Sequence, residues 1–168
     1  LKDLKVAADK GYNAARNSGL EVNPKGLGQF ATQAQQDLTV GPKYAFTGGP
    51  DGTAPKTLAI LDRLQSPPAG ATVTASNLDT LRRQINNIAG ETKDFKPTAD
   101  AKAAMVLKRS FADYLENIPQ NHVVAGDPAR FVSSIKEANA NYAAASRLGT
   151  FDARIEKAGN QANRQIAG

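Results

Sequence analysis

The sequence predicts an all-α fold, an elongated bundle of five or six helices with a long C-terminal helix and one long Gly/Pro-rich loop. Three observations lead to this prediction. Apolar residues recur at steps of three and four along most of the chain. Capping residues followed by proline, and glycines after apolar runs, mark where helices begin and end. The β-branched runs at 72–74 and 123–124 are too short to make a sheet.

The composition fits one domain, residues 1–168, that is large enough to bury a core. Much of the 40% hydrophobic content is alanine, and only 6% of the residues are aromatic. The core therefore depends on a modest set of larger apolar residues, with alanine faces that let helices approach closely. Both ends of the sequence fall inside apparent helices, and the first residue is Leu1. We expect a piece of a longer protein.

The first three helices are set by their boundaries. The first is expected from Leu1 to about Ser18, and the second from the Asn23-Pro24 cap to about Thr39. The stretch 41–52 is rich in glycine and proline and reads as a loop, with Tyr44 and Phe46 holding it to the body. A short helix follows from 53–55 to about 65, where a Ser-Pro-Pro run ends it.

Two amphipathic helices come next. Thr74 or Ser76 caps the fourth helix, Gly90 closes it, and its apolar stripe is Leu78, Leu81, Ile85 and Ile88. Thr98 caps a helix of about twenty residues that Pro119 stops. The core candidates of this fifth helix include Met105, Phe111 and Leu115.

The last helix is expected to begin at Asp127-Pro128 and to continue to about 165, with a bend at Gly149-Thr150. Its apolar seam follows steps of four and three through Phe131, Ile135, Ala138, Tyr142 and Ala145. The alanine-rich part of this seam has two interpretations. It is either a docking face for a partner helix or the place where this helix crosses its own neighbours closely.

The net charge of +5 is spread evenly along the chain, which is more typical of solubility than of nucleic-acid binding. The basic pairs Arg82-Arg83 and 108–109 would support nucleic-acid binding only if they lay together in space. Asp79, with Arg82 and Arg83, is interpreted as surface charge, and the alternative is a partner-binding patch.

No sequence motif predicts a catalytic, metal or cofactor site. The chain has no cysteine, and His122 is its one histidine, so the usual sets of metal ligands cannot form. Gly26-Leu27-Gly28-Gln29-Phe30-Ala31 matches a dinucleotide fingerprint in its letters, but the expected strand and βαβ unit do not surround it. Glycines 48, 49 and 52 lack the Gly-Lys-Ser/Thr of a phosphate loop. No apolar run is long enough to span a membrane.

The order of these helical motifs resembles helical segments of large bacteriophage and prophage-encoded proteins, including virion-associated and uncharacterised ones. The resemblance rests on residues 8–19, 76–83 and 154–158, and on Ala138 and Tyr142 in the last helix. It implies a structural or assembly module inside a longer polypeptide, and it supplies no catalytic residues.

These observations predict a non-catalytic module that binds protein partners or itself through helix faces, without a cofactor. The candidate interaction residues are Tyr142, Ala138, Ala145, Arg82 and Arg83. The alternative is a nucleic-acid-binding helical domain, and the third hypothesis is an enzyme. The compartment is left open between the cytoplasm and a virion.

Overall fold

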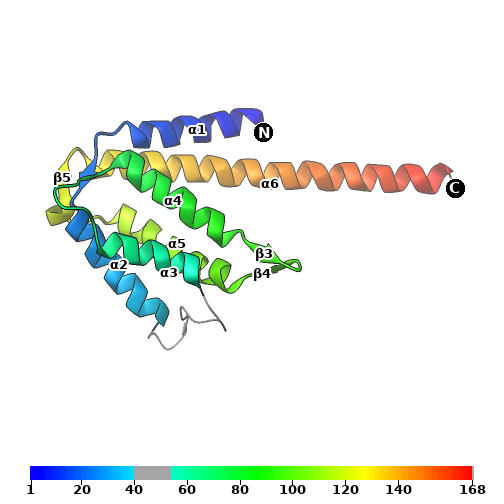
Figure 1. The fold of residues 1–168 in the computed structure, drawn as a ribbon. Coiled ribbons are helices and arrows are strands. Elements are labelled where there is room, and N and C mark those ends of the chain that lie inside the picture. Colours follow the sequence, from blue (N-terminus) through cyan, green and yellow to red (C-terminus); the bar gives the residue numbers. More distant parts are fainter. Residues whose placement is uncertain (40–53, 168) are drawn as a thin grey trace.

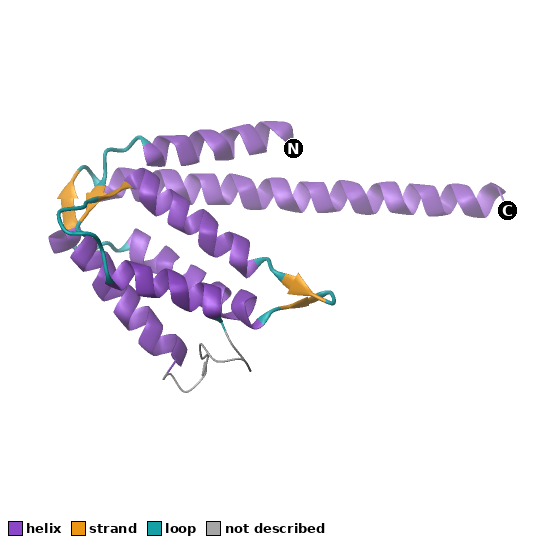
Figure 2. Ribbon diagram, in the orientation of Figure 1, coloured by secondary structure: helices purple, strands orange, loops and turns teal. Residues whose placement is uncertain are grey.

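The computed structural model describes residues 1–39 and 54–167, with side chains apart from those of 150–154 and 162–167. The chain is mostly helical, at 75% helix, with small antiparallel sheets (Figures 1 and 2). The loop predicted at 41–52, with Tyr44 and Phe46, lies outside the described residues. In chain order the elements are α1 (Lys2–Arg16), β1 (Glu21–Val22), α2 (Pro24–Thr39), α3 (Pro55–Gln65), β2 (Val73–Thr74), α4 (Ala75–Ala89), β3 (Thr92–Lys93), β4 (Lys96–Pro97), α5 (Ala99–Glu116), a 3₁₀ turn (Gln120–His122), β5 (Val123–Ala125) and α6 (Pro128–Ala167).

The helix boundaries follow local side-chain chemistry, as the sequence predicted. Thr74 caps α4 and forms a capping box with Asn77, because each side chain accepts a hydrogen bond from the other residue's backbone N–H. Thr98 caps α5 by accepting from the N–H of Ala101 at 3.0 Å. Gly90 ends α4. These boundaries needed no information from the rest of the fold.

The prediction that no sheet forms was wrong. β1 pairs antiparallel with both β2 and β5, which gives a three-stranded sheet in the order β2-β1-β5. Strands this short are not stable alone. Here they join the helices at one end of the molecule, and Val22 of β1 is fully buried. Tertiary packing therefore stabilises a strand pairing that could not be predicted from such short segments of sequence.

A β-hairpin, β3–β4, forms the second sheet and projects beyond the ends of α4 and α5 (Figure 2). Its two turn residues, Asp94 and Phe95, have φ angles of 53° and 64°. Positive φ at both central positions is the geometry of a type I′ turn, which glycine and asparagine ordinarily fill. Phe95 is fully exposed at this tip.

The helices pack in pairs, with α1 along α6, α4 along α5 and α2 along α3. The α1–α6 contact is close because Gly11 faces Ala138, and a Cβ atom at position 11 would lie 2.8 Å from the Cβ of Ala138. Phe111, Leu115, Leu78 and Ile85 belong to the buried core, as predicted. Met105, predicted as a core candidate, is 45% exposed, so it points away from that core.

The last helix, α6, spans 40 residues without interruption at Gly149, a length of about 60 Å. Phe131, Ile135, Ala138 and Ala145 of its predicted seam are buried. Its C-terminal part extends past the other helices (Figure 1), and every side chain described from 155 to 161 is exposed. Among the described residues, no helix has the length and apolarity needed to cross a membrane.

Candidate functional site

An open groove of about 1010 Å³ lies between the α1–α6 pair and the α4–α5 pair. All four helices contribute side chains to it. Its apolar part includes Ile85, Phe111, Leu115, Val132, Ile135 and Ala143, and its polar and aromatic part includes Asp9, Tyr12, Arg16, Arg82, Arg83, Asn86, Lys108, Glu116, Asn139 and Tyr142. Mixed linings of this kind, with apolar surface and a few placed polar groups, are typical of binding sites.

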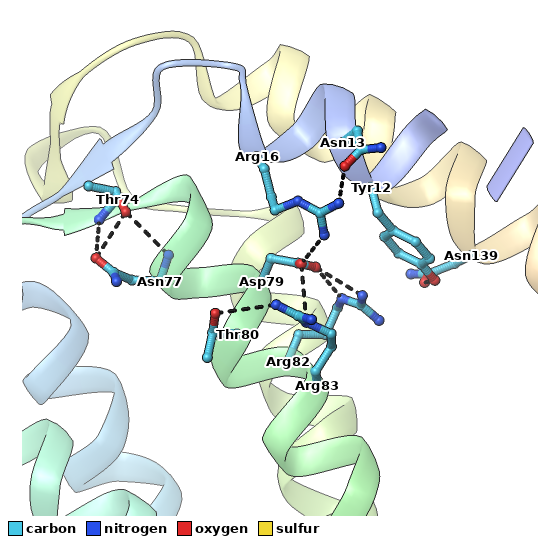
Figure 3. Close-up of polar contacts among 10 residues, drawn as sticks. All are labelled: Tyr12, Asn13, Arg16, Thr74, Asn77, Asp79, Thr80, Arg82, Arg83 and Asn139. Carbon is cyan, nitrogen blue, oxygen red and sulfur yellow. Dashed lines mark hydrogen bonds and ion pairs between the residues drawn. The ribbon is translucent and has the colours of Figure 1, made fainter. Parts of the chain in front are cut away.

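One end of the groove is organised by Asp79, whose side chain is fully buried behind the arginines of the lining (Figure 3). Its Oδ1 accepts from Nε and Nη2 of Arg82 at 3.1 and 2.9 Å. Its Oδ2 accepts from Nη1 of Arg16 at 2.7 Å, and Nε of Arg83 lies 3.4 Å from the same oxygen. Four donor contacts match the roughly four acceptor positions of a carboxylate. Asp79 is therefore saturated.

The interpretation of Asp79 as surface charge was wrong. Asp79 directly follows Leu78, which belongs to the apolar stripe of α4. Its side chain therefore faces α1, where Arg16 binds it. A buried carboxylate needs such partners, because an uncompensated charge away from water costs several kcal/mol (roughly 3–5). The partner from α1 lies 63 residues away in the sequence, and no local pattern indicates it.

Tyr12 connects this cluster to α6. The guanidinium carbon of Arg82 lies 4.0 Å from the centroid of the Tyr12 ring, which is a cation–π contact. The Tyr12 hydroxyl donates to Oδ1 of Asn139 on α6 at 2.7 Å (Figure 3). Burial raises the pKa of Tyr12, and the charge of Arg82 opposes that shift. The Tyr12 side chain of α1 thus links α4 and α6 at the groove, through its contacts with Arg82 and Asn139.

The structure divides the five predicted interaction residues into two groups. Arg82, Arg83 and Tyr142 come together on the groove lining, and Tyr142 is 59% exposed. Ala138 and Ala145 are buried, and Ala138 packs against Gly11 of α1. Ala138 therefore serves the close crossing of α1 and α6, which was the second interpretation of the alanine-rich seam.

The basic pair 108–109 was named from the sequence, and Lys108 lines the groove. Sequence reasoning missed Arg16, Tyr12, Asn139 and Asn86 as groove residues. Each lies on a regular helix, and its role depends on a partner helix far away in the sequence. Asn86 is notable because its buried Oδ1 has no hydrogen-bond partner among the described residues. A buried acceptor without a donor is uncommon in folded proteins. The sequence carries no signal for it.

His122 lies outside the groove, where it holds the start of α2. Its backbone carbonyl accepts from the N–H of Asn23 at 2.7 Å, and its ring Nδ1 lies 2.9 Å from the hydroxyl of Tyr114. A Cβ at Gly26 would lie 2.5 Å from the imidazole, and one at Gly28 would lie 3.0 Å from the carbonyl oxygen of Leu64. The space beside both glycines of the apparent dinucleotide fingerprint is therefore filled by other residues of the protein.

The groove presents cations, hydrogen-bonding groups and apolar surface, with Arg83 and Lys108 exposed to solvent. Such an arrangement has the chemical groups to bind a chain or a molecule by charge and shape. Comparison of this chain with protein-family models, with curated proteins and with solved structures gives no match.

Proposed function

We propose that this chain is a non-catalytic helical module that binds another polypeptide, in a larger structural assembly of the kind found in phage-encoded proteins. The binding surface would be the groove together with the exposed face of α6. The observation that supports it is the position of Tyr142, Arg82 and Arg83, which sequence reasoning selected separately and which line one open groove.

The exposed apolar side chains of α6 support the same proposal. Leu148 and Ile155 are 43% and 56% exposed and lie seven residues apart, so they share one face of the helix. Helices bind grooves and one another through such spaced apolar side chains. An elongated bundle with α6 as its long arm would present this face to a partner chain or to a second copy.

Site-specific photo-crosslinking tests the proposal. A benzophenone side chain at Tyr142 should form crosslinks to a polypeptide in the native assembly that contains this chain. The same group at Val124 on β5 is the control, because Val124 is similarly exposed, at 55%, and lies outside the groove lining. Equal crosslinking from both positions, or none from position 142, would argue against the groove as the binding surface.

Nucleic-acid binding is the second candidate, because Arg82, Arg83 and Lys108 line one groove, as that function requires. One feature weighs against it. Arg109, the fourth member of the basic pairs, lies outside the groove lining. Size exclusion with light scattering, with and without duplex DNA, separates the candidates. Binding to DNA with a steep salt dependence would replace the polypeptide proposal.

A further inference from the structure

The three-arginine cluster leaves positive charge on the groove that the described residues do not neutralise. Asp79 carries one negative charge against three guanidinium groups, and its acceptor positions are filled. Arg83 is the most exposed of the three, with 56% of its side chain accessible. Its remaining contact is long, at 3.5 Å between Nη2 and the hydroxyl of Thr80. Arg83 therefore has donors to offer to an incoming group.

Lys108 adds a second available cation from α5, the helix that packs along α4. It is exposed on α5, lines the same groove, and has no carboxylate within ion-pair distance in the part of the chain that is described. Among the acidic groups of the lining, Glu116 lies 3.9 Å from Lys136, outside the groove lining. Asp9 remains on the α1 rim. The groove therefore has two available cations on its α4–α5 wall, and Tyr142 and Ala143 are exposed on the α6 wall.

The apolar side chains of the lining favour a polypeptide as the occupant, because a phosphate backbone has no apolar groups to place against them. On α6, Tyr142 and Ala143 are exposed and Val132 is half-buried, so these three side chains of the lining are suited to aliphatic or aromatic partner groups.

We propose that the partner segment is an acidic amphipathic helix. Its carboxylates bind Arg83 and Lys108, and its apolar side chains lie against the accessible apolar residues of α6, which are Val132, Tyr142 and Ala143. This inference rests on the proposed function and specifies the chemistry of the partner. Helix-in-groove binding uses such a pairing of one apolar face with flanking charges, and charge complementarity fixes the orientation.

The probe is a synthetic helical peptide with leucines at helical spacing and glutamates between them, beside an analogue in which every glutamate is glutamine. Binding is measured by fluorescence anisotropy and located by backbone amide NMR shifts. The test variant is Arg83→Gln with Lys108→Gln. The matched control is Arg109→Gln with Lys102→Gln, which removes the same charges from exposed positions outside the groove lining.

The glutamate peptide should shift amides around Asn86, Val132 and Tyr142. Its affinity should fall about tenfold in the test variant and little in the control, since two exposed charge pairs are lost only in the former. The glutamine peptide should bind about tenfold more weakly to the unmodified chain. Equal affinity of the two peptides, equal loss in both variants, a footprint elsewhere, no binding, or tighter binding of duplex DNA at the same amides would overturn the inference.

The two proposals fail in distinguishable ways. If the glutamine peptide occupies the groove as well as the glutamate peptide does, the groove is a polypeptide site without a preference for acid. The proposed function then stands, and the inference about charge is lost. If position 142 forms no crosslinks in the native assembly, the proposed function itself is lost, whatever the peptides do.

Discussion

A carboxylate that is removed from water is stable in its charged form only when donors surround it. At the residue scale, Asp79 meets this condition with three arginines from two helices. The arginines are in turn held in fixed positions, since Arg82 lies on the ring of Tyr12 and Arg16 hydrogen-bonds Asn13. The same carboxylate thus joins α1 to α4 and sets the direction of the guanidinium groups that reach the groove.

Asp79→Asn should lower the free energy of unfolding by about 2–3 kcal/mol, because it leaves the arginines without the charge that they surround. Urea denaturation followed by circular dichroism measures the loss. Asp113→Asn is the control, because Asp113 is an exposed aspartate on α5, and a change within about 0.5 kcal/mol is expected there. Similar losses in both variants would show that Asp79 has no special role in the fold.

Tyr114 gives a prediction for pH. Burial raises its pKa from 10.0 to about 12. The pKa of Tyr114 in the folded state lies above its pKa in the unfolded chain. The stability that the protonated Tyr114 contributes is therefore complete below pH 10 and is lost as the pH rises toward 12. The loss is at most about 1.4 kcal/mol per pH unit in that range.

Comparison with Tyr114→Phe isolates this residue from the lysines and other tyrosines that titrate in the same range. The variant lacks the hydrogen bond to His122, so it should be less stable at neutral pH, by about 1 kcal/mol. Its stability should then fall less steeply from pH 10 to 12 in urea titrations. Parallel pH profiles for the two proteins would rule out Tyr114 as the cause.

At the element scale, the α1–α6 crossing depends on a residue without a side chain. Gly11→Ala would place a Cβ 2.8 Å from the Cβ of Ala138 and 3.1 Å from the backbone oxygen of Ser134. Helix α1 must then move away from α6, and the expected loss is about 1–2 kcal/mol in thermal or urea unfolding. Gly159→Ala on the same α6 is the control, since that position faces open space. It should leave stability unchanged or raise it slightly, because alanine favours helix.

Removing the exposed aromatic residue of the β3–β4 hairpin should increase the stability of the chain. Phe95 has a φ of 64° and buries none of its side chain, so it carries backbone strain without a packing gain. Phe95→Gly relieves that strain and should stabilise the chain by about 0.5–1 kcal/mol. Phe95→Ala keeps the strained φ and should change little. Thermal unfolding of the two variants decides, and an equal response would mean that the turn strain is negligible.

What the sequence could predict at this scale was local. Thr74, Thr98 and Gly90 act within a few residues of themselves, so their roles as caps were visible in the pattern. The β2-β1-β5 sheet was missed, because its strands are two or three residues long and come from three distant parts of the chain. The groove itself was not predicted. Arg82, Arg83, Tyr142 and the pair 108–109 were named as candidate residues, and Arg16 was missed because its partner Asp79 is distant in the sequence.

At the scale of the whole molecule, one helix belongs to two environments. From Phe131 to Ala145, α6 is packed against the body, and Phe131 and Ala138 are fully buried. From 155 to 161 every described side chain is exposed, and the helix extends past the other elements. An isolated helix of this kind has little stability of its own in water, because most helical stability in proteins comes from tertiary packing. The same chain therefore contains a stable body and a weakly stabilised arm.

Hydrogen exchange should resolve these two regions. Amides at 131–145 should open only with global unfolding, whereas those at 155–161 should exchange through local fraying and be orders of magnitude less protected. A second chain that packs against residues 155–161 would raise the protection of their amides. The same measurement therefore also reports on association. Strong protection at 155–161 that disappears on dilution would indicate self-association through α6. Strong protection that persists at all concentrations would contradict the exposure of the arm, and the proposal that its face is free to bind would fail with it.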